Sequence, residues 1–175
     1  MSCRMNSSRS LYPSMSDKLP DHVILLQGVF EEGFFDRFSG QPQDAIFILE
    51  GRPGLTAARS NGRALVKRKI QPTVLADNMA GFLFYKKRVK EVWMAYQSVY
   101  PEGAVCSIGA MILAVLAKKH RIAVYLFKGR PQPDLMAKEK EIFSFNGQRV
   151  SAAGTRGYVP LLEWVDKKYI TKIYS

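Results

Sequence analysis

Side chains suited to binding an anion stand just after two apolar segments of the chain. Arg52 and Arg59 follow the segment 45–49, and guanidinium groups hold phosphate through paired donors. Asp77 and Asn78 follow a second segment, where a carboxylate can orient a ligand hydroxyl. Each group also has a structural alternative, because the arginines could pair with neighbouring carboxylates and Asp77 could cap a helix.

A third group stands before an apolar helix predicted over 108–119. Ser107 is a suitable N-cap, and unpaired amides at Ile108 and Gly109 would form an anion site that glycine lets a ligand approach closely. Many helix ends of this kind bind nothing. Cys106 precedes them, and its thiol is either activated by the helix N-terminus or a small buried group that packs a loop.

The elements that must position these groups alternate along the chain. Continuous apolar runs predict buried strands, and apolar residues three to four positions apart predict helices between them. This alternation indicates a mostly parallel sheet covered on both faces, in a single α/β, doubly wound Rossmann-like domain over residues 21–175. Ligands bind such domains beside the carboxyl ends of the strands, so the groups above should share one edge. The predicted strands are 22–26, 45–49, 73–76, 89–96 and 122–127, and the predicted helices are 30–38, 55–69, one starting at 77 or 78, and 108–119.

Outside this alternation the pattern is less regular. Residues 1–20, rich in Ser and Arg, are expected to form a disordered arm. Residues 97–106 are predicted to be a loop, and Asn146-Gly147 suits the type I′ turn of a hairpin. The predicted hairpin strands are 141–145 and 148–150, and the segments 158–164 and 168–174 are predicted to be a terminal strand or short helices.

The composition bounds the possible partners. The 175-residue chain carries a formal net charge of +11, which fits a phosphorylated small molecule, a polyanion such as RNA, or a merely solvated basic surface. It has no zinc-ligand spacing, RNA-binding aromatic motif, secretory signal or apolar run of about 18 residues, so we expect no metal, cofactor or membrane partner. Two cysteines far apart in the sequence favour a reducing, cytoplasmic setting. The basic clusters are 63–69, 86–90, 118–121 and 167–172.

Several segments, in matching order and spacing, resemble one known family. It comprises the alpha, beta and delta regulatory subunits of initiation factor 2B, together with methylthioribose-1-phosphate isomerase and ribose-1,5-bisphosphate isomerase. The resemblance covers about 23–175 and only the family's C-terminal, Rossmann-like half, which implies a reduced member or a different site. The segments are Glu50-Gly51-Arg52-Pro53, similar to Glu-Ser/Thr-Arg-Pro; Leu75-Ala76-Asp77-Asn78-Met79-Ala80-Gly81, similar to Thr-Asp-Asn-Met-Ala; Ile108-Gly109 and 113–120, similar to Ile-Gly-Thr and Leu-Ala-Val-Leu-Ala-Lys-His-His; and 168–173, similar to Glu-Tyr-Ile-Thr-Ala-Ile.

The resemblance also implies where isomerase chemistry would take place, and there this chain departs from the family. The isomerases have a cysteine after the first strand and an aspartate after the fourth, which move protons on an open-chain sugar. Here the first strand ends Leu26-Gln27-Gly28, with no thiol, and Gln97 stands in place of the aspartate, where its amide does not exchange protons usefully near neutral pH. The family's Asn-Lys before Ile-Gly is replaced by Cys106-Ser107, and its Gln-Gly-Ala-Arg keeps only the arginine, Arg59.

These departures lead to one main expectation and two alternatives. We expect a non-catalytic, initiation factor 2B-like domain that binds a sugar phosphate or nucleotide and acts in translation through protein contacts, as a homodimer or with a related partner. One alternative is a sugar-phosphate isomerase with rearranged catalytic groups, Cys106 and Asp77, and the other is a basic RNA-associated module. The expected ligand-binding residues are Arg52, Arg59, Asp77, Asn78, Ser107, Ile108 and Gly109.

Overall fold

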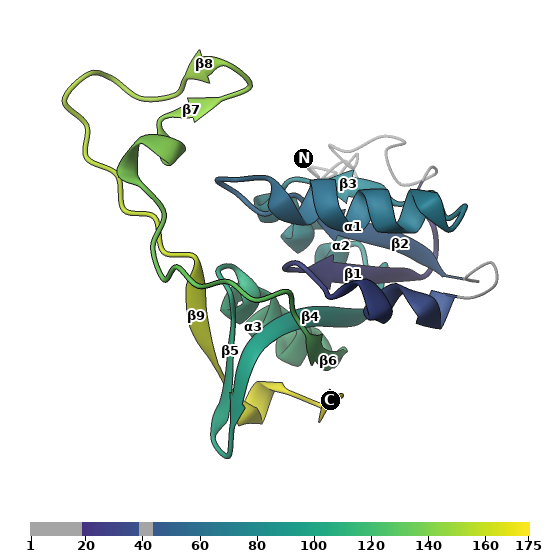
Figure 1. Ribbon diagram of the computed structural model, residues 1–175. Coiled ribbons are helices and arrows are strands. Elements are labelled where there is room, and N and C mark those ends of the chain that lie inside the picture. The colour runs from purple at the N-terminus through teal and green to yellow at the C-terminus, as the bar shows by residue number, and fades with distance from the viewer. Residues whose placement is uncertain (1–18, 39–43) are drawn as a thin grey trace, which may run out of the picture.

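A mostly parallel sheet forms the centre of the protein. The computed structural model describes residues 19–38 and 44–175, so nearly all of the arm predicted at 1–20 lies outside the described residues. Six strands run parallel in the order β3-β2-β1-β4-β6-β10 (Figure 1), and the direction of winding reverses between β1 and β4. Ligands bind doubly wound sheets at this switch point. The strands are β1 Val23–Gln27, β2 Ala45–Leu49, β3 Thr73–Leu75, β4 Val89–Tyr100, β6 Ala123–Lys128 and β10 Lys172–Ile173.

Helices cover both faces of the sheet, because its central strands are apolar on both faces. In β1, Val23 and Leu25 pack with one helix layer, whereas Ile24 and Leu26 pack with the other. The first layer contains α2 and α3, and the second contains α1 and the 3-10 helix η1 (Figure 1). This arrangement confirms the predicted α/β, doubly wound class. The helices are η1 Glu32–Phe38, α1 Thr56–Lys67, η2 Asp77–Met79, α2 Ala80–Tyr85 and α3 Ala110–His120.

The predicted loop at 97–106 is wrong. Strand β4 runs through its first part, and β5 returns antiparallel to β4 and pairs on its other side with β9. Only Pro101 and Glu102 lie in the turn between them, so the proline and the nearby glycine mark a tight turn and not a long loop. Ala104 and Cys106, two positions apart in β5, are fully buried, as one face of a strand requires. The two strands are β5 Gly103–Ser107 and β9 Leu162–Asp166.

A long connection follows β6 before the chain returns in β9. It contains the short helix η3 and the β7–β8 hairpin, which projects away from the main sheet (Figure 1). The hairpin turn has Asn146 at φ 51° and Gly147 at φ 75°, as the predicted type I′ turn requires. The remaining elements are η3 Glu139–Ile142, β7 Ser144–Phe145, β8 Gln148–Arg149 and η4 Lys167–Tyr169.

The predicted helices form with shifted ends. The segment 30–38 folds as a 3-10 helix, α1 lies inside the predicted range 55–69, and α3 begins at Ala110 instead of 108. Within residues 19–38 and 44–175, no helix is both long enough and apolar enough to cross a membrane.

Candidate functional site

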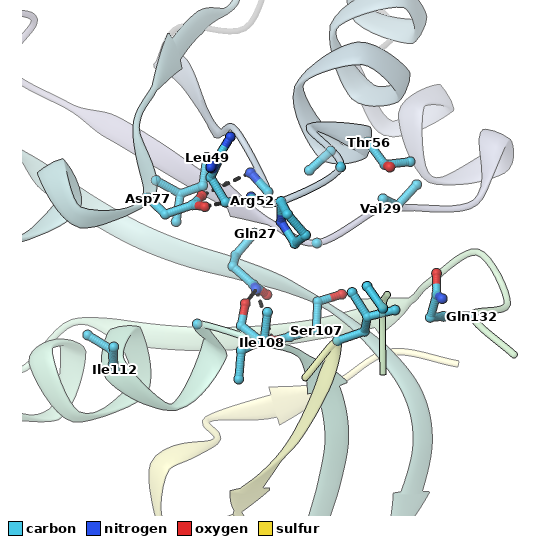
Figure 2. Close-up of a pocket in the computed structure, with 18 of the residues that line it drawn as sticks. Gln27, Val29, Leu49, Arg52, Thr56, Asp77, Ser107, Ile108, Ile112 and Gln132 are labelled. Carbon is cyan, nitrogen blue, oxygen red and sulfur yellow. Dashed lines mark hydrogen bonds between the residues drawn. The ribbon is translucent and has the colours of Figure 1, made fainter. Parts of the chain in front are cut away.

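A cavity of about 790 Å³ lies at the carboxyl edge of the sheet. Its lining comes from the ends of β1 and β2, the segment after β3, the starts of α1 and α3, and the connection that follows β6. Figure 2 shows the loop that carries Arg52 on one side of the cavity and the Ser107–Ile108 segment on the other, with Gln27 between them. The predicted site residues that line it are Arg52, Asp77, Asn78, Ser107, Ile108 and Gly109.

Asp77 fixes the shape of the loop after β2. Its Oδ1 accepts a hydrogen bond from the Gly51 amide at 2.9 Å, and its Oδ2 accepts one from the Arg52 amide at 2.8 Å. Asp77 does not cap its own helix, because η2 has Ala76 as N-cap and no side-chain cap bond. Gly51 has φ 73°, and a Cβ there would lie 2.9 Å from the Ala57 Cβ, so the loop requires glycine at this position.

The loop delivers the N-terminus of α1 to the cavity. Thr56 and Ala57 line the cavity, and in the described part of the chain their backbone amides donate to no acceptor. Such amides at the positive end of a helix dipole bind anions. The guanidinium carbon of Arg52 lies 4.4 Å from the ring centroid of Phe145 in β7. The face of the guanidinium group contacts the ring, which fixes the orientation of Arg52. The N–H donors at the edge of the group remain available to a ligand.

Arg59 takes no part in the cavity lining. It is exposed on α1, one turn beyond the residues that face the cavity. The structure therefore brings Arg52 and Gly109 to the same cavity and leaves Arg59 outside it, where its ligand-binding role stays a prediction.

Gln27, at the end of β1, is buried beside the cavity and only partly satisfied. Its Nε2 donates to the carbonyl oxygens of Ser107 at 3.0 Å and Ile108 at 2.9 Å, which ties β1 to the start of α3 (Figure 2). The side chain is 4% exposed, and no donor in residues 19–38 and 44–175 reaches its Oε1. A buried acceptor without a donor is costly, and a ligand hydroxyl beside it would satisfy it.

The predicted anion site at the start of α3 is wrong for one of its two amides. The Ile108 amide is not free, because it donates to the Leu161 carbonyl at 2.9 Å. The Met111 amide, in the first turn of α3, donates to Oε1 of Glu163 at 2.9 Å, so the protein's own carboxylate occupies this helix end. Ser107 does not cap the helix, since Gly109, at φ 92°, is the N-cap.

Cys106 belongs to the core. It lies in β5 with no exposed surface and is not part of the cavity lining. Burial raises the pKa of the Cys106 thiol to about 12, and the Glu163 carboxylate adds to the increase. The structure fits the alternative of a packed thiol, although the group lies in a strand and not in a loop. Cys106 and Asp77 do not face one cavity together.

Gln97, which the resemblance matches to an aspartate of the isomerases, holds the connection after β6. Its Nε2 donates to the Arg130 carbonyl at 2.9 Å, and its Oε1 accepts from the Gln132 amide at 2.7 Å. A carboxylate could accept the second bond but could not donate the first. Gln97 does not line the cavity, whereas Gln132 does.

Asn61 is a positioning residue that the sequence pattern does not reveal. It is fully buried in α1, its Nδ2 donates to the Gly28 carbonyl at 2.8 Å, and its Oδ1 accepts from the Phe30 amide at 3.3 Å. These bonds hold the loop after β1 at the cavity wall. The only signal in the sequence is an asparagine in the middle of a predicted helix, where its low helix propensity weakens the prediction.

The charge of the cavity differs from that of the chain. Two basic residues, Arg52 and Lys138, and three acidic residues, Asp77, Asp134 and Glu141, line it, so the excess of positive charge lies elsewhere. Burial raises the pKa of Glu50 next to the loop, the nearby Asp77 carboxylate raises it further, and Arg52 lowers it. In residues 19–38 and 44–175 no three His, Cys, Asp or Glu side chains gather as metal ligands.

Comparison with known sequences gives relatives that carry this domain within a longer chain. A 5-deoxyribose 1-phosphate isomerase of Petrotoga mobilis is 30% identical over 142 residues, which cover 74% of this chain and 41% of the relative. A methylthioribose-1-phosphate isomerase of Syntrophus aciditrophicus is 29% identical over 145 residues, covering 76% of this chain and 40% of the relative. The chain thus spans about two fifths of the length of these relatives.

Solved structures of longer proteins contain the same fold. A translation initiation factor eIF-2B delta subunit from A. fulgidus matches with a TM-score of 0.72 at 17% identity, over 89% of this chain and 52% of that one. A 5-methylthioribose 1-phosphate isomerase from Pyrococcus horikoshii matches with a TM-score of 0.73 at 19% identity, over 90% of this chain and 51% of that one. The model of the Initiation factor 2 subunit family matches residues 37–129, more than half of the chain. The resemblance found in the sequence is confirmed, and the chain belongs to the Initiation factor 2 subunit family.

Proposed function

We propose that this protein binds a phosphorylated sugar in the cavity, does not convert it, and acts through contacts with other proteins. One observation carries the proposal: the cavity presents anion-binding and hydroxyl-binding groups together. The amides at the start of α1 and the edge of Arg52 suit a phosphate, and the unsatisfied oxygen of Gln27 suits a sugar hydroxyl. A nucleotide, the other ligand expected from the sequence, offers the same two kinds of group.

The names of two relatives support this ligand class. They act on methylthioribose 1-phosphate and 5-deoxyribose 1-phosphate, each a pentose phosphate. A role in translation, a homodimeric state and a cytoplasmic location remain parts of the same proposal, and the match to an eIF-2B delta subunit is compatible with them.

The absence of turnover is proposed from the side chains at the cavity. Proton transfer between neighbouring carbons requires titratable groups within hydrogen-bond reach of the sugar. By the resemblance, the end of the first strand lacks the isomerases' thiol and Gln97 replaces their carboxylate, and the amides of Gln27 and Gln97 both bind backbone groups. Cys106 is buried in the core, and this burial supports the proposal over the isomerase alternative, which needs the thiol at the sugar.

A thermal-shift titration tests ligand binding. Methylthioribose 1-phosphate should raise the melting temperature, whereas unphosphorylated methylthioribose at the same concentration should not. A ligand present at about 100 times its Kd stabilises a protein by about 2.7 kcal/mol. For a chain of this size that is a shift of roughly 5–10 °C, using about 2–4 °C per kcal/mol. A flat response to sugar phosphates and nucleotides alike would contradict the proposal.

The two arginines give a matched pair of variants. Arg52→Gln should abolish most of the ligand-dependent shift, because it removes the positive charge and the paired guanidinium donors at the cavity. Arg59→Gln removes an equal charge from the exposed face of α1 and should leave the shift intact. If both variants lose the ligand-dependent shift equally, the ligand binds through the overall charge of the protein or at another site.

Turnover is measured separately by NMR of the sugar. On incubation with methylthioribose 1-phosphate the aldose signals should persist, and no ketose signals should appear beyond those in a protein-free control. Conversion that disappears in the Arg52→Gln variant would support the isomerase alternative.

A further inference from the structure

One helix layer presents a group of large apolar side chains to solvent. Met79, Phe82 and Tyr85 come from the α2 region, and Ile112 and Val115 come from α3, the neighbouring helix on the same sheet face. These five side chains, here called the α2–α3 surface, are between 38% and 69% exposed. In the opposite layer, Val66 is the only large apolar side chain of α1 exposed to this degree.

The charges that α2 and α3 themselves carry, and those just after α2, are of one sign, whereas Asp77 and Glu163 approach only the starts of these helices. Neither α2 nor α3 contains an acidic residue. Lys86 and Lys87 follow the end of α2, and Lys118 and Lys119 lie in the last turn of α3. The Lys86 ammonium lies 5.5 Å from the centroid of the Phe82 ring and 5.6 Å from that of Tyr85, so positive charge stands directly on the apolar side chains. An apolar area with a basic border differs from a merely solvated basic face.

We propose that the α2–α3 surface binds an acidic amphipathic helix of another protein. Exposed apolar areas of this kind mark interaction sites, and an amphipathic helix covers them with residues spaced three to four apart. Glutamates beside the apolar stripe of the partner would face the lysines at the border, which favours the acidic partner over a neutral one. A second copy of this chain is a poorer occupant than an acidic helix, because a two-fold contact would bring two basic borders together with no acidic residue on α2 or α3 to match them.

The docked helix would also border the cavity. Ile112 belongs to the α2–α3 surface and lines the cavity, so a partner on this surface would stand beside a ligand inside it. The docking proposal does not depend on that ligand, and it is tested in its absence.

Fluorescence anisotropy with designed peptides tests the proposal. The probe is a labelled peptide of about 18 residues, roughly 27 Å long as a helix, with leucines on one face and glutamates on the others. A second peptide carries lysines in place of the glutamates. We expect the acidic peptide to bind at least about tenfold more tightly than the basic one. Equal binding of both, or binding of neither, would overturn the proposal.

Paired variants locate the binding. The double variant Tyr85→Ser/Ile112→Ser should weaken binding of the acidic peptide at least about tenfold, whereas Val66→Ser, on α1, should not change it. Reversing two charges at the border in Lys86→Glu/Lys119→Glu should weaken binding similarly, and Arg63→Glu/Lys67→Glu, the same charge change on α1, should have a much smaller effect. If the α1 variants lose as much as the α2–α3 variants, binding is non-specific and the proposal fails.

Two further measurements control for unfolding and for self-association. All substituted side chains are partly or largely exposed, so circular dichroism melting curves should remain close to that of the wild type. Sedimentation velocity compares the association state of the wild type with that of Tyr85→Ser/Ile112→Ser. The two should agree, even if the chain forms a dimer through another face. A dimer that dissociates in the variant would identify a second copy as the occupant and overturn the proposal.

Discussion

Asp77 and Gln27 line the cavity, and each holds backbone groups of the cavity wall in place. Asp77 uses both carboxylate oxygens on two successive amides of the loop after β2, and Gln27 uses both amide hydrogens on two successive carbonyls before α3. Each side chain keeps lone pairs that no protein donor in the described residues fills, and for Gln27 these are the lone pairs of a buried oxygen. The cavity wall is therefore both braced and able to accept hydrogen bonds from a ligand.

The bracing by Asp77 can be measured. Asp77→Ala removes the acceptors of two amides, and we expect it to lower the free energy of unfolding by about 2–3 kcal/mol. Asn78→Ala, at the next position, removes an exposed side chain and should change stability by less than about 0.5 kcal/mol. Urea denaturation measures both changes. A similar small effect for both variants would show that the loop does not depend on the Asp77 carboxylate.

The Cys106 thiol should be inert in the folded protein and should make stability depend on pH. In a Cys3→Ser background, iodoacetamide at pH 8 should label Cys106 only after denaturation, because its pKa of about 12 leaves almost no thiolate. The folded pKa lies above the ordinary value of about 8.5, so the unfolded state loses this proton first as the pH rises.

Stability should therefore decrease at alkaline pH. The contribution of Cys106 is fully present below about pH 8.5 and is lost as the pH rises toward 12, so the free energy of unfolding should fall over this window. Cys106→Ala should flatten that fall, which urea denaturation at pH 8, 9 and 10 would measure. In the labelling experiment, rapid reaction of Cys106 with iodoacetamide at pH 8 in the folded protein would contradict its buried position.

At this scale the sequence predicted part of the site. Arg52, Asp77 and Gly109 were expected at the ligand edge because they follow strands or precede a helix, and all three line the cavity. The occupied Ile108 amide could not be predicted, since its acceptor Leu161 lies in a distant, irregular segment of the sequence. Whether the Arg59 side chain faces the cavity or solvent depends on the exact residue at which α1 begins. A sequence pattern places that residue only to within one or two positions.

Among the elements, β5 and the β7–β8 hairpin show how distant partners and local turn residues determine the structure of a segment. The alternation of strand and helix predicted the parallel strands, because buried strands have long apolar runs. Strand β5 was missed because its partners, β4 and β9, impose the extended form on a short segment with small residues. The turn of the β7–β8 hairpin was predicted correctly, since Asn-Gly specifies it locally, but the predicted strand 141–145 is shorter because η3 includes Glu141 and Ile142.

Two glycine substitutions distinguish close packing between strands from local helix propensity. Gly103 in β5 faces β9 so closely that a Cβ would collide with the Val165 carbonyl oxygen and the Trp164 ring. Gly103→Ala should therefore lower the free energy of unfolding by about 2 kcal/mol or more. Gly62→Ala, inside α1 with no atom within 4 Å of the new Cβ, should raise it by about 0.5–1 kcal/mol. Denaturation curves in which both variants shift the same way would contradict the close packing of β5 on β9.

In the whole molecule, the carboxyl edge of the sheet combines segments that are far apart in the sequence. The start of α1 lines one end of the cavity, α3 contributes apolar side chains, and the connection after β6 completes the lining. The excess positive charge lies outside this cavity, part of it beside the α2–α3 surface. The proposed ligand inside the cavity and the proposed partner on the α2–α3 surface would therefore meet at Ile112, which belongs to both.

The most direct test is an NMR titration of isotope-labelled protein with methylthioribose 1-phosphate. We predict that the backbone amides of Thr56 and Ala57 and the side-chain amide of Gln27 shift together and saturate with one dissociation constant. Shifts confined to the amides of Gly109 and Met111 at the start of α3, or no shift at any of these signals, would contradict a sugar-phosphate site built from α1 and β1.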